Sequence, residues 1–183
     1  MSAMRSATRR EVPMRRIAAG AAIVAVVALG VGLSTAAVAA KSKDHAKPHT
    51  LTAAAVYREF VKAGLPVSGL IVYTAATDPN HLLGRPTGYI SKCAWVDARV
   101  PSTDTSGLTP GDIGFGGGVE MFRTAAEAKA RAKYIFTIDS AAPILGSEYD
   151  YLAGRVLVRV SQYLTPTQAA SYAKVVHGKL HTG

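Results

Sequence analysis

The stretch Tyr89–Val100, YISKCAWVDARV, predicts a long β-strand in this 183-residue chain. Successive side chains of an extended strand point to opposite faces, so Cys93 and Trp95 share one face while Ala94 and Val96 share the other. Both faces therefore carry apolar side chains, which is typical of a strand in the middle of a sheet. We expect the rest of the chain to assemble around this strand.

Patterns on either side of this strand predict further strands and three helices. β-prone runs predict strands at 69–74 and 118–122, and one or two more within 149–161. Apolar residues at helical spacing predict helices at 52–63, from Thr124 onwards, and from Thr165 to about His177. The last two begin with capping boxes, in which Thr124 pairs with Glu127 and Thr165 with Gln168.

Long loops, without alternation of parallel strands and helices, favour an antiparallel arrangement. The predicted fold class is α+β, with an antiparallel sheet of four to five strands and about three helices packed mainly on one face. Residues 51–178 form this single globular domain, and residues 179–183 form a tail.

Residues 1–40 predict export. The uncharged stretch 17–40 follows a leader with five arginines and ends in small residues, which suits cleavage by signal peptidase between Ala39 and Lys41. The mature chain is then secreted or extracellular and begins with a basic linker at 41–50. The alternative is a retained single-pass anchor with the domain outside, since 24 helical residues span about 36 Å.

Composition excludes a nucleic-acid partner. Much of the net charge of +9 lies in the leader and the tails, and the folded part is nearly balanced. Contact with a membrane is expected only through residues 17–40, if they are not cleaved. Cys93 is the single cysteine, so no intramolecular disulfide forms, and its place beside Trp95 predicts a small buried side chain.

Two long loops, 75–88 and 101–117, are rich in turn-forming residues and are the predicted binding surface. Within the first loop Asp78, His81 and Arg85 form the candidate binding residues, although Asp-Pro-Asn-His is also a turn sequence. The glycine-rich run 111–118 precedes a strand instead of opening a helix, so it does not predict a phosphate site.

An acid/base site is the alternative use of these side chains. Asp78 and His81 could meet Asp97 or Glu120 in the folded chain, and Asp97, Glu120, Glu148 and Asp150 could converge as a carboxylate pair. Surface ion pairs of these carboxylates with Arg99, Arg123 and Arg155 are the competing interpretation. The sequence lacks HExxH, paired CxxC and Gly-x-Ser-x-Gly patterns, so we assign no catalytic residue and expect neither a metal nor another cofactor.

Three segments, 77–86, 117–122 and 145–151, resemble a group of small uncharacterised exported proteins, secreted or lipoprotein-like, of high-GC actinobacteria. The resemblance covers about Leu51 to Val176 and implies no activity, because the group has no assigned function. This chain lacks the cysteine to which the lipoprotein members attach lipid.

Together these features predict an exported, non-catalytic domain that binds a ligand or partner at or outside the cell envelope, such as a cell-wall component. Two alternatives stay open. One is an extracellular hydrolase with acid/base residues around Asp78 and His81, and the other is a membrane-tethered structural domain.

Overall fold

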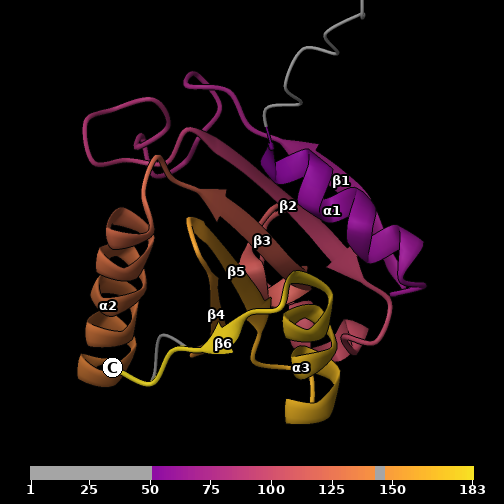
Figure 1. Cartoon of the computed structure of the whole chain (residues 1–183). Helices are drawn as coiled ribbons and strands as arrows, with labels where there is room; N and C mark the ends of the chain where they lie inside the picture. Colours follow the sequence, from indigo (N-terminus) through magenta and orange to yellow (C-terminus); the bar gives the residue numbers. More distant parts are fainter. Residues whose placement is uncertain (1–50, 143–146) are drawn as a thin grey trace, which may run out of the picture. The chain divides into compact units, whose positions relative to one another are not determined.

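Six strands form one antiparallel sheet in the computed structural model, which describes residues 51–142 and 147–183. The sheet order is β1-β2-β3-β5-β4-β6 (Figure 1). The strands are β1 (Val67–Val72), β2 (Ser91–Asp97), β3 (Gly116–Met121), β4 (Glu148–Ala153), β5 (Val156–Ser161) and β6 (Lys179–Leu180). The helices are α1 (Ala53–Lys62), α2 (Ala125–Ala141) and α3 (Pro166–Val176), with short 3₁₀ turns η1 (Ser102–Thr105) and η2 (Ile113–Phe115).

The predicted α+β class is confirmed, with one strand more than expected. The additional strand is β6, where Leu180 and Lys179 pair with Tyr151 and Leu152 of β4. Residues 179–180 are therefore part of the sheet and not of a tail. The strand predicted at 89–100 corresponds to β2. It has β1 on one side and β3 on the other, as expected for an internal strand.

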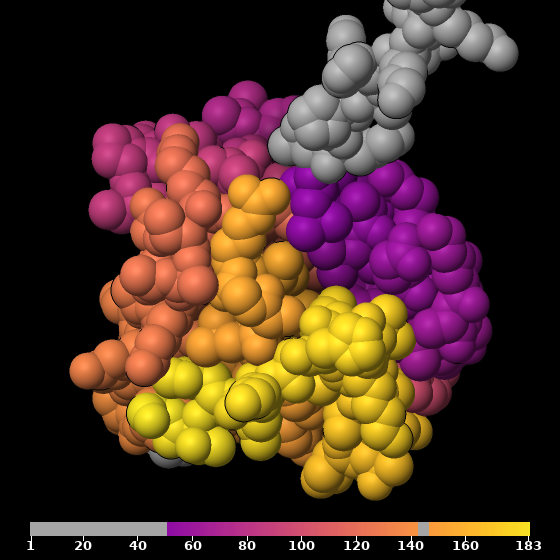
Figure 2. Space-filling model, viewed as in Figure 1, coloured from indigo at the N-terminus to yellow at the C-terminus, as the bar shows by residue number. Residues whose placement is uncertain are grey.

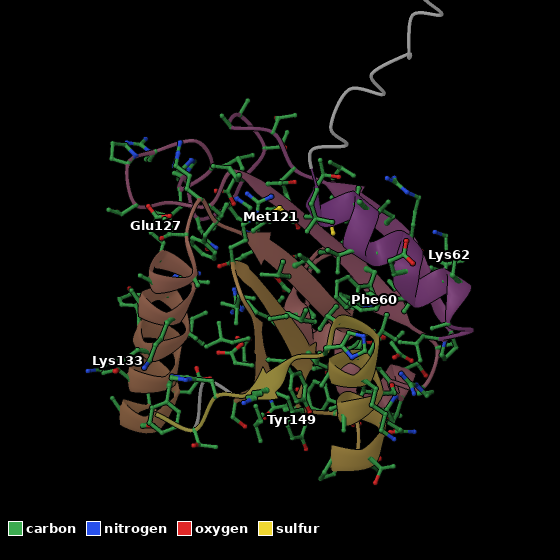
Figure 3. All side chains as sticks on the ribbon, viewed as in Figure 1. Phe60, Lys62, Met121, Glu127, Lys133 and Tyr149 are labelled. Atoms are coloured by element: carbon green, nitrogen blue, oxygen red, sulfur yellow. The ribbon has the colours of Figure 1, made fainter. Side chains whose placement is uncertain are left out.

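One face of the sheet holds an apolar core under α1 and α3. Val56 and Phe60 of α1 and Tyr172 of α3 pack on Cys93 and Trp95 of β2. Figure 3 shows Phe60 turned inward from α1, whereas Lys62 extends into solvent. In the space-filling view α3 and the C-terminal residues, in yellow, lie beside the indigo surface of α1 (Figure 2).

The other face is covered by α2 and by the loop that joins β1 to β2. Ala128, Ala132 and Ile135 of α2 are buried against Leu157 of β5. Two of the three helices thus cover the first face and α2 covers the second. Because α2 rests on two alanines, it brings little apolar volume to this face and leaves room beside it.

Three consecutive glycines in β3 let neighbouring groups approach the sheet closely. A Cβ at Gly117 would lie 2.6 Å from the Trp95 indole and 2.5 Å from the Arg159 carbonyl oxygen, and one at Gly118 would lie 2.9 Å from the Ile113 side chain. The glycines therefore allow the Trp95 ring to pack on one face of β3 and the η2 turn to pack on the other.

The predicted leader and linker, residues 1–50, lie outside the described residues, so the signal and anchor predictions stay predictions. Within residues 51–142 and 147–183, none of the helices combines the length and the apolar character that crossing a membrane requires.

Gly117→Ala should destabilise the domain by about 2–3 kcal/mol, because the added methyl overlaps backbone and a buried indole that have no room to move. Urea unfolding followed by Trp95 fluorescence measures this change. Gly154→Ala is the control, since its Cβ would meet nothing within 4 Å and only its φ of +58° costs about 1 kcal/mol. Equal losses in the two variants would contradict the packing role of Gly117.

Candidate functional site

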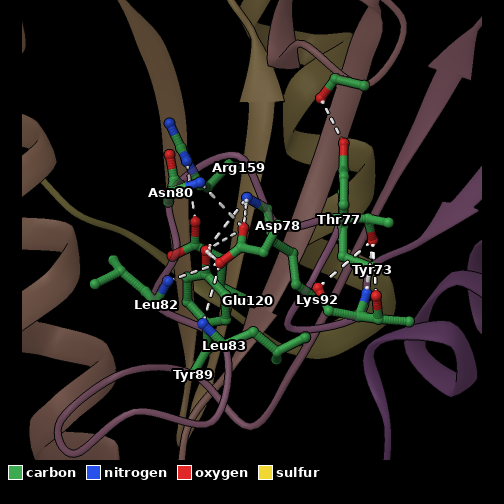
Figure 4. A network of polar contacts seen from close by, with 12 residues as sticks. Tyr73, Thr77, Asp78, Asn80, Leu82, Leu83, Tyr89, Lys92, Glu120 and Arg159 are labelled. Carbon is green, nitrogen blue, oxygen red and sulfur yellow. Dashed lines mark hydrogen bonds and ion pairs between the residues drawn. The ribbon is translucent and has the colours of Figure 1, made fainter.

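Asp78 is the centre of a buried polar network that fixes the loop between β1 and β2. Its carboxylate accepts hydrogen bonds from the backbone N–H groups of Leu82 (2.8 Å) and Leu83 (3.0 Å) and from the Tyr89 hydroxyl (2.6 Å). It also forms an ion pair with Lys92 of β2 at 2.8 Å (Figure 4). These contacts close the loop on itself and tie it to the sheet.

The Asp78 carboxyl group stays ionised within this network. Burial by itself would raise the pKa of Asp78, but hydrogen bonds from Lys92 and Tyr89 outweigh burial and hold that pKa below its usual range. Burial and the Asp78 carboxylate raise the pKa of the Tyr89 hydroxyl, which therefore remains a donor. The Lys92 ammonium also lies 4.8 Å from the centre of the Tyr73 ring, a cation–π distance.

A second network of charged side chains extends across β3, β5 and β4, beside the network of Asp78. Arg159 of β5 donates to Glu120 of β3 (3.0 Å) and makes two hydrogen bonds to Glu148 of β4 (2.6 and 2.9 Å). Arg131 of α2 also donates to Glu120, at 2.9 Å. Burial would raise the pKa of Glu120, but Arg159 and Arg131 together lower it, so this carboxyl stays ionised although its side chain is almost fully buried.

These two networks line a cavity of about 430 Å³ on the second face of the sheet. Ala94 and Gly118, which face each other across β2 and β3, contribute little or no side chain to its floor, and Ile113 of η2 packs against Gly118. Lys92, Glu120 and Arg159 surround this floor, and Pro79 and Asn80 from the first loop form part of the wall.

The second predicted loop forms another wall of the same cavity. Residues 111–114 line it, with Ile113 of η2 packed close to Gly118. The remaining lining comes from the end of α2, through Ile138 and Asp139, and from residues at 147–148 and 161–163. The two loops that were predicted as the binding surface therefore line one cavity, although β2 separates them in the chain.

Asp150 is a buried carboxyl next to this cluster. It lies opposite Arg159 in the β4–β5 pairing and on the same side of β4 as Glu148. Burial, followed by the negative charge of Glu148, raises the pKa of Asp150 to about 9. Asp150 is therefore protonated at neutral pH, and its Oδ1 atom is buried without a hydrogen-bond partner among the described residues.

The structure separates the residues that the sequence analysis grouped as binding or acid/base candidates. Asp78 is buried, whereas His81 and Arg85 lie exposed on the loop surface and do not line the cavity. Asp97 lies on the same face of β2 as Trp95, which is the face opposite to that of Glu120. It forms an ion pair with Arg99 and accepts a hydrogen bond from Tyr172, so it belongs to the apolar side of the domain.

The expected convergence of carboxylates is therefore found for three residues and not for the fourth. Glu120, Glu148 and Asp150 gather around Arg159, and Asp97 stays on the other face. The expected surface pairs with Arg123 and Arg155 do not form, since Glu120 and Glu148 pair with Arg131 and Arg159 in partly buried positions.

Lys92, Arg131, Asp139 and Arg159 were missed by the sequence analysis. Lys92 and Arg159 each interrupt an apolar strand, Ile90–Val96 and Val156–Val160 respectively, and a charge inside a buried strand is a signal that could have pointed to them. Nothing in the sequence pattern distinguishes Arg131 and Asp139 from the other charged residues of α2.

Cys93 is fully buried, as predicted, and burial raises the pKa of its thiol to about 12. Within the described part of the chain, no three histidine, cysteine, aspartate or glutamate side chains lie close enough to hold a metal ion.

A comparison of the chain with protein-family models, curated proteins and solved structures finds no match in any of the three. The resemblance to exported actinobacterial proteins therefore stays a prediction.

Asp78→Ala should destabilise the domain by about 3–5 kcal/mol, because Lys92 then lies buried without a counter-ion and two backbone N–H groups lose their acceptor. Urea unfolding at pH 7 measures this loss. His81→Ala and Arg85→Ala, on the exposed part of the same loop, should change stability by less than about 0.5 kcal/mol. A loss at Asp78 no larger than at His81 would show that the network does not hold the loop.

Asp150→Asn should stabilise the domain more at pH 8 than at pH 5. The folded wild type keeps the Asp150 proton until about pH 9, while the unfolded chain releases it near 3.8, so wild-type stability falls as pH rises between these values. The asparagine does not titrate, so its advantage over wild type should grow by at least about 1 kcal/mol across this range.

Urea midpoints at the two pH values test this prediction. Asp104→Asn, an exposed change of the same kind, should show no such difference between pH 5 and pH 8. A constant difference between Asp150→Asn and wild type at both pH values would mean that Asp150 is ionised in the folded protein.

Proposed function

We propose that this chain is an exported, non-catalytic domain that binds a small polar ligand in the cavity on the second face of its sheet. The observation that carries the proposal is the cavity itself: a hollow of about 430 Å³ lined by the buried charges of Lys92 and Glu120 and by the half-buried Arg159. Sites for small molecules commonly have volumes of about 300–1,000 Å³ and a few fixed polar groups.

The buried charges suit recognition because they are held in place before any ligand arrives. Arg159 is bound by Glu120 and Glu148 and Lys92 by Asp78, so binding does not have to order these long side chains. Each nevertheless keeps donor capacity, since an ammonium has three N–H groups and a guanidinium five. The Glu148 carboxylate keeps acceptor capacity, since it accepts hydrogen bonds only from Nε and Nη2 of Arg159 among the described residues. A polar ligand can therefore hydrogen-bond to groups whose positions are already set.

The same contacts favour binding over hydrolysis. A general base needs a free lone pair, and the Asp78 carboxylate already accepts from Lys92, Tyr89, Leu82 and Leu83. Of its proposed partners, His81 is exposed and Asp97 lies on the opposite face of β2. Glu120 lies on the same face as Lys92, but Arg131 and Arg159 already pair with its carboxylate. The hydrolase alternative consequently has less support than the binding domain.

The place of binding is proposed from the sequence of residues 1–40. A basic leader, an apolar stretch and small residues before Lys41 support export, and the ligand would then be a component at or outside the cell envelope. A membrane-tethered domain would present the same cavity outside the cell, so the binding proposal does not depend on cleavage.

A thermal-shift screen of the full chain against small polar molecules tests the proposal. A ligand at 100 times its Kd should stabilise the domain by about 2.7 kcal/mol. Ala94→Met, which fills the cavity from its floor, and Gln162→Trp, which fills it from the exposed rim, should abolish the shift.

Val96→Met is the matched control, because Val96 faces the same side of β2 but does not line the cavity. Ligand-free unfolding curves establish that each variant folds. If every ligand found in the screen stabilises the wild type, Ala94→Met and Gln162→Trp equally, the cavity is not the binding site.

A further inference from the structure

A second hollow lies between α2 and the 75–88 loop, and it adjoins the cavity. This groove has a volume of about 860 Å³ and is lined mainly by apolar groups, among them Leu82 of the loop and Ala130, Tyr134, Ile135 and Ile138 of α2. Tyr134 is 58% exposed and Ile138 is 41% exposed, so α2 presents large apolar side chains at the surface. Figure 1 shows this loop near the first turns of α2.

The groove and the cavity share lining residues. Asn80, Ile138, Asp139 and Arg159 line both hollows, so the polar cavity and the apolar groove meet along these side chains. A ligand that fills both would have a polar end over the sheet and an apolar part along α2. Such a molecule covers the exposed apolar surface of Tyr134 and Ile138, which a purely polar ligand would leave in water.

The charged residues where the cavity meets the groove indicate whether the polar end of the ligand is positive or negative. Lys92, Arg131 and Arg159 are each bound to carboxylates. The half-buried Asp139 makes no hydrogen bond or ion pair with any residue of 51–142 or 147–183 in the structure. Burial and the charge of Glu148 raise the pKa of Asp139, and they outweigh the charge of Arg159, which lowers it. A ligand cation beside Asp139 would counteract both of the effects that raise this pKa.

From these contacts we infer that the ligand is a single-chain amphiphile with an amino or ammonium group, its charge beside Asp139 and its hydrocarbon chain in the groove along α2. This inference rests on the proposed function and specifies the class of ligand for the same site. An anionic head would have to compete with Glu120 and Glu148 for arginines that are already paired. A cationic head meets the carboxylate of Asp139 directly.

Calorimetric titration of the full chain with decylammonium, butylammonium and decanoate, each below its micellar concentration, tests the inference. Decylammonium should bind tighter than butylammonium by on the order of 50-fold, as expected if about half of the additional methylenes are buried. Decanoate should bind at least about tenfold more weakly than decylammonium, because Asp139 and Glu148 repel its carboxylate.

Variants assign the two ends of the ligand to the two hollows. Ala130→Trp places a bulky ring in the groove and should weaken decylammonium at least tenfold while leaving butylammonium unchanged. Asp139→Asn should weaken both ammonium compounds. Ala125→Trp is the matched control, since Ala125 is also exposed on α2 but lines neither hollow. Every variant carries the same residues 1–50, so differences between variants report on the folded domain.

The outcomes separate this inference from the proposed function. If butylammonium binds as tightly as decylammonium and Ala94→Met abolishes both, the cavity binds ligand but the amphiphile inference is wrong. If decanoate binds as well as decylammonium, the assigned charge is wrong. If neither ammonium compound binds, the inference is overturned, while the proposed function is still judged by its own screen.

Discussion

The buried ion pair between Asp78 and Lys92 is the interaction on which the second face of this domain depends. Lys92 lies near the start of β2 and is buried there, where an unpaired ammonium would be strongly unfavourable. Asp78 supplies the counter-ion and at the same time accepts two backbone N–H groups of its own loop. One carboxylate therefore anchors the loop to the sheet, and the anchored loop forms walls of both the cavity and the adjoining groove.

The two faces of the sheet serve different purposes because their side chains differ. On the first face Trp95, Phe60 and Tyr172 pack in aromatic contact and form the core under α1 and α3. On the second face the central strands contribute Lys92, Glu120 and Arg159, with Ala94 and Gly118 between them. Charged groups do not close-pack as aliphatic side chains do, and small residues leave space. The apolar face provides stability, and the charged face provides the cavity.

Much of the fold could be predicted because it rests on local patterns. Apolar periodicity located the helices and strands, and the capping boxes of Thr124 and Thr165 are both formed. β6 was missed because two residues carry no periodicity, and their pairing with β4 is a long-range contact. The loops at 75–88 and 101–117, which were selected as the binding surface, line one cavity, but Asp78 was expected at the surface and is buried. Its burial depends on Lys92, fourteen positions further along the chain.

The order and spacing of residues were enough to predict the fold class, the internal position of β2 and the export of the chain. Which charges meet depends on contacts that form only in the folded domain. Arg159 joins Glu120 and Glu148 through the register of three strands, while Asp97 is turned to the other face by its position in β2. Which strands are neighbours is set by packing between distant segments, so the site became visible only when the sheet and its covering loops were assembled.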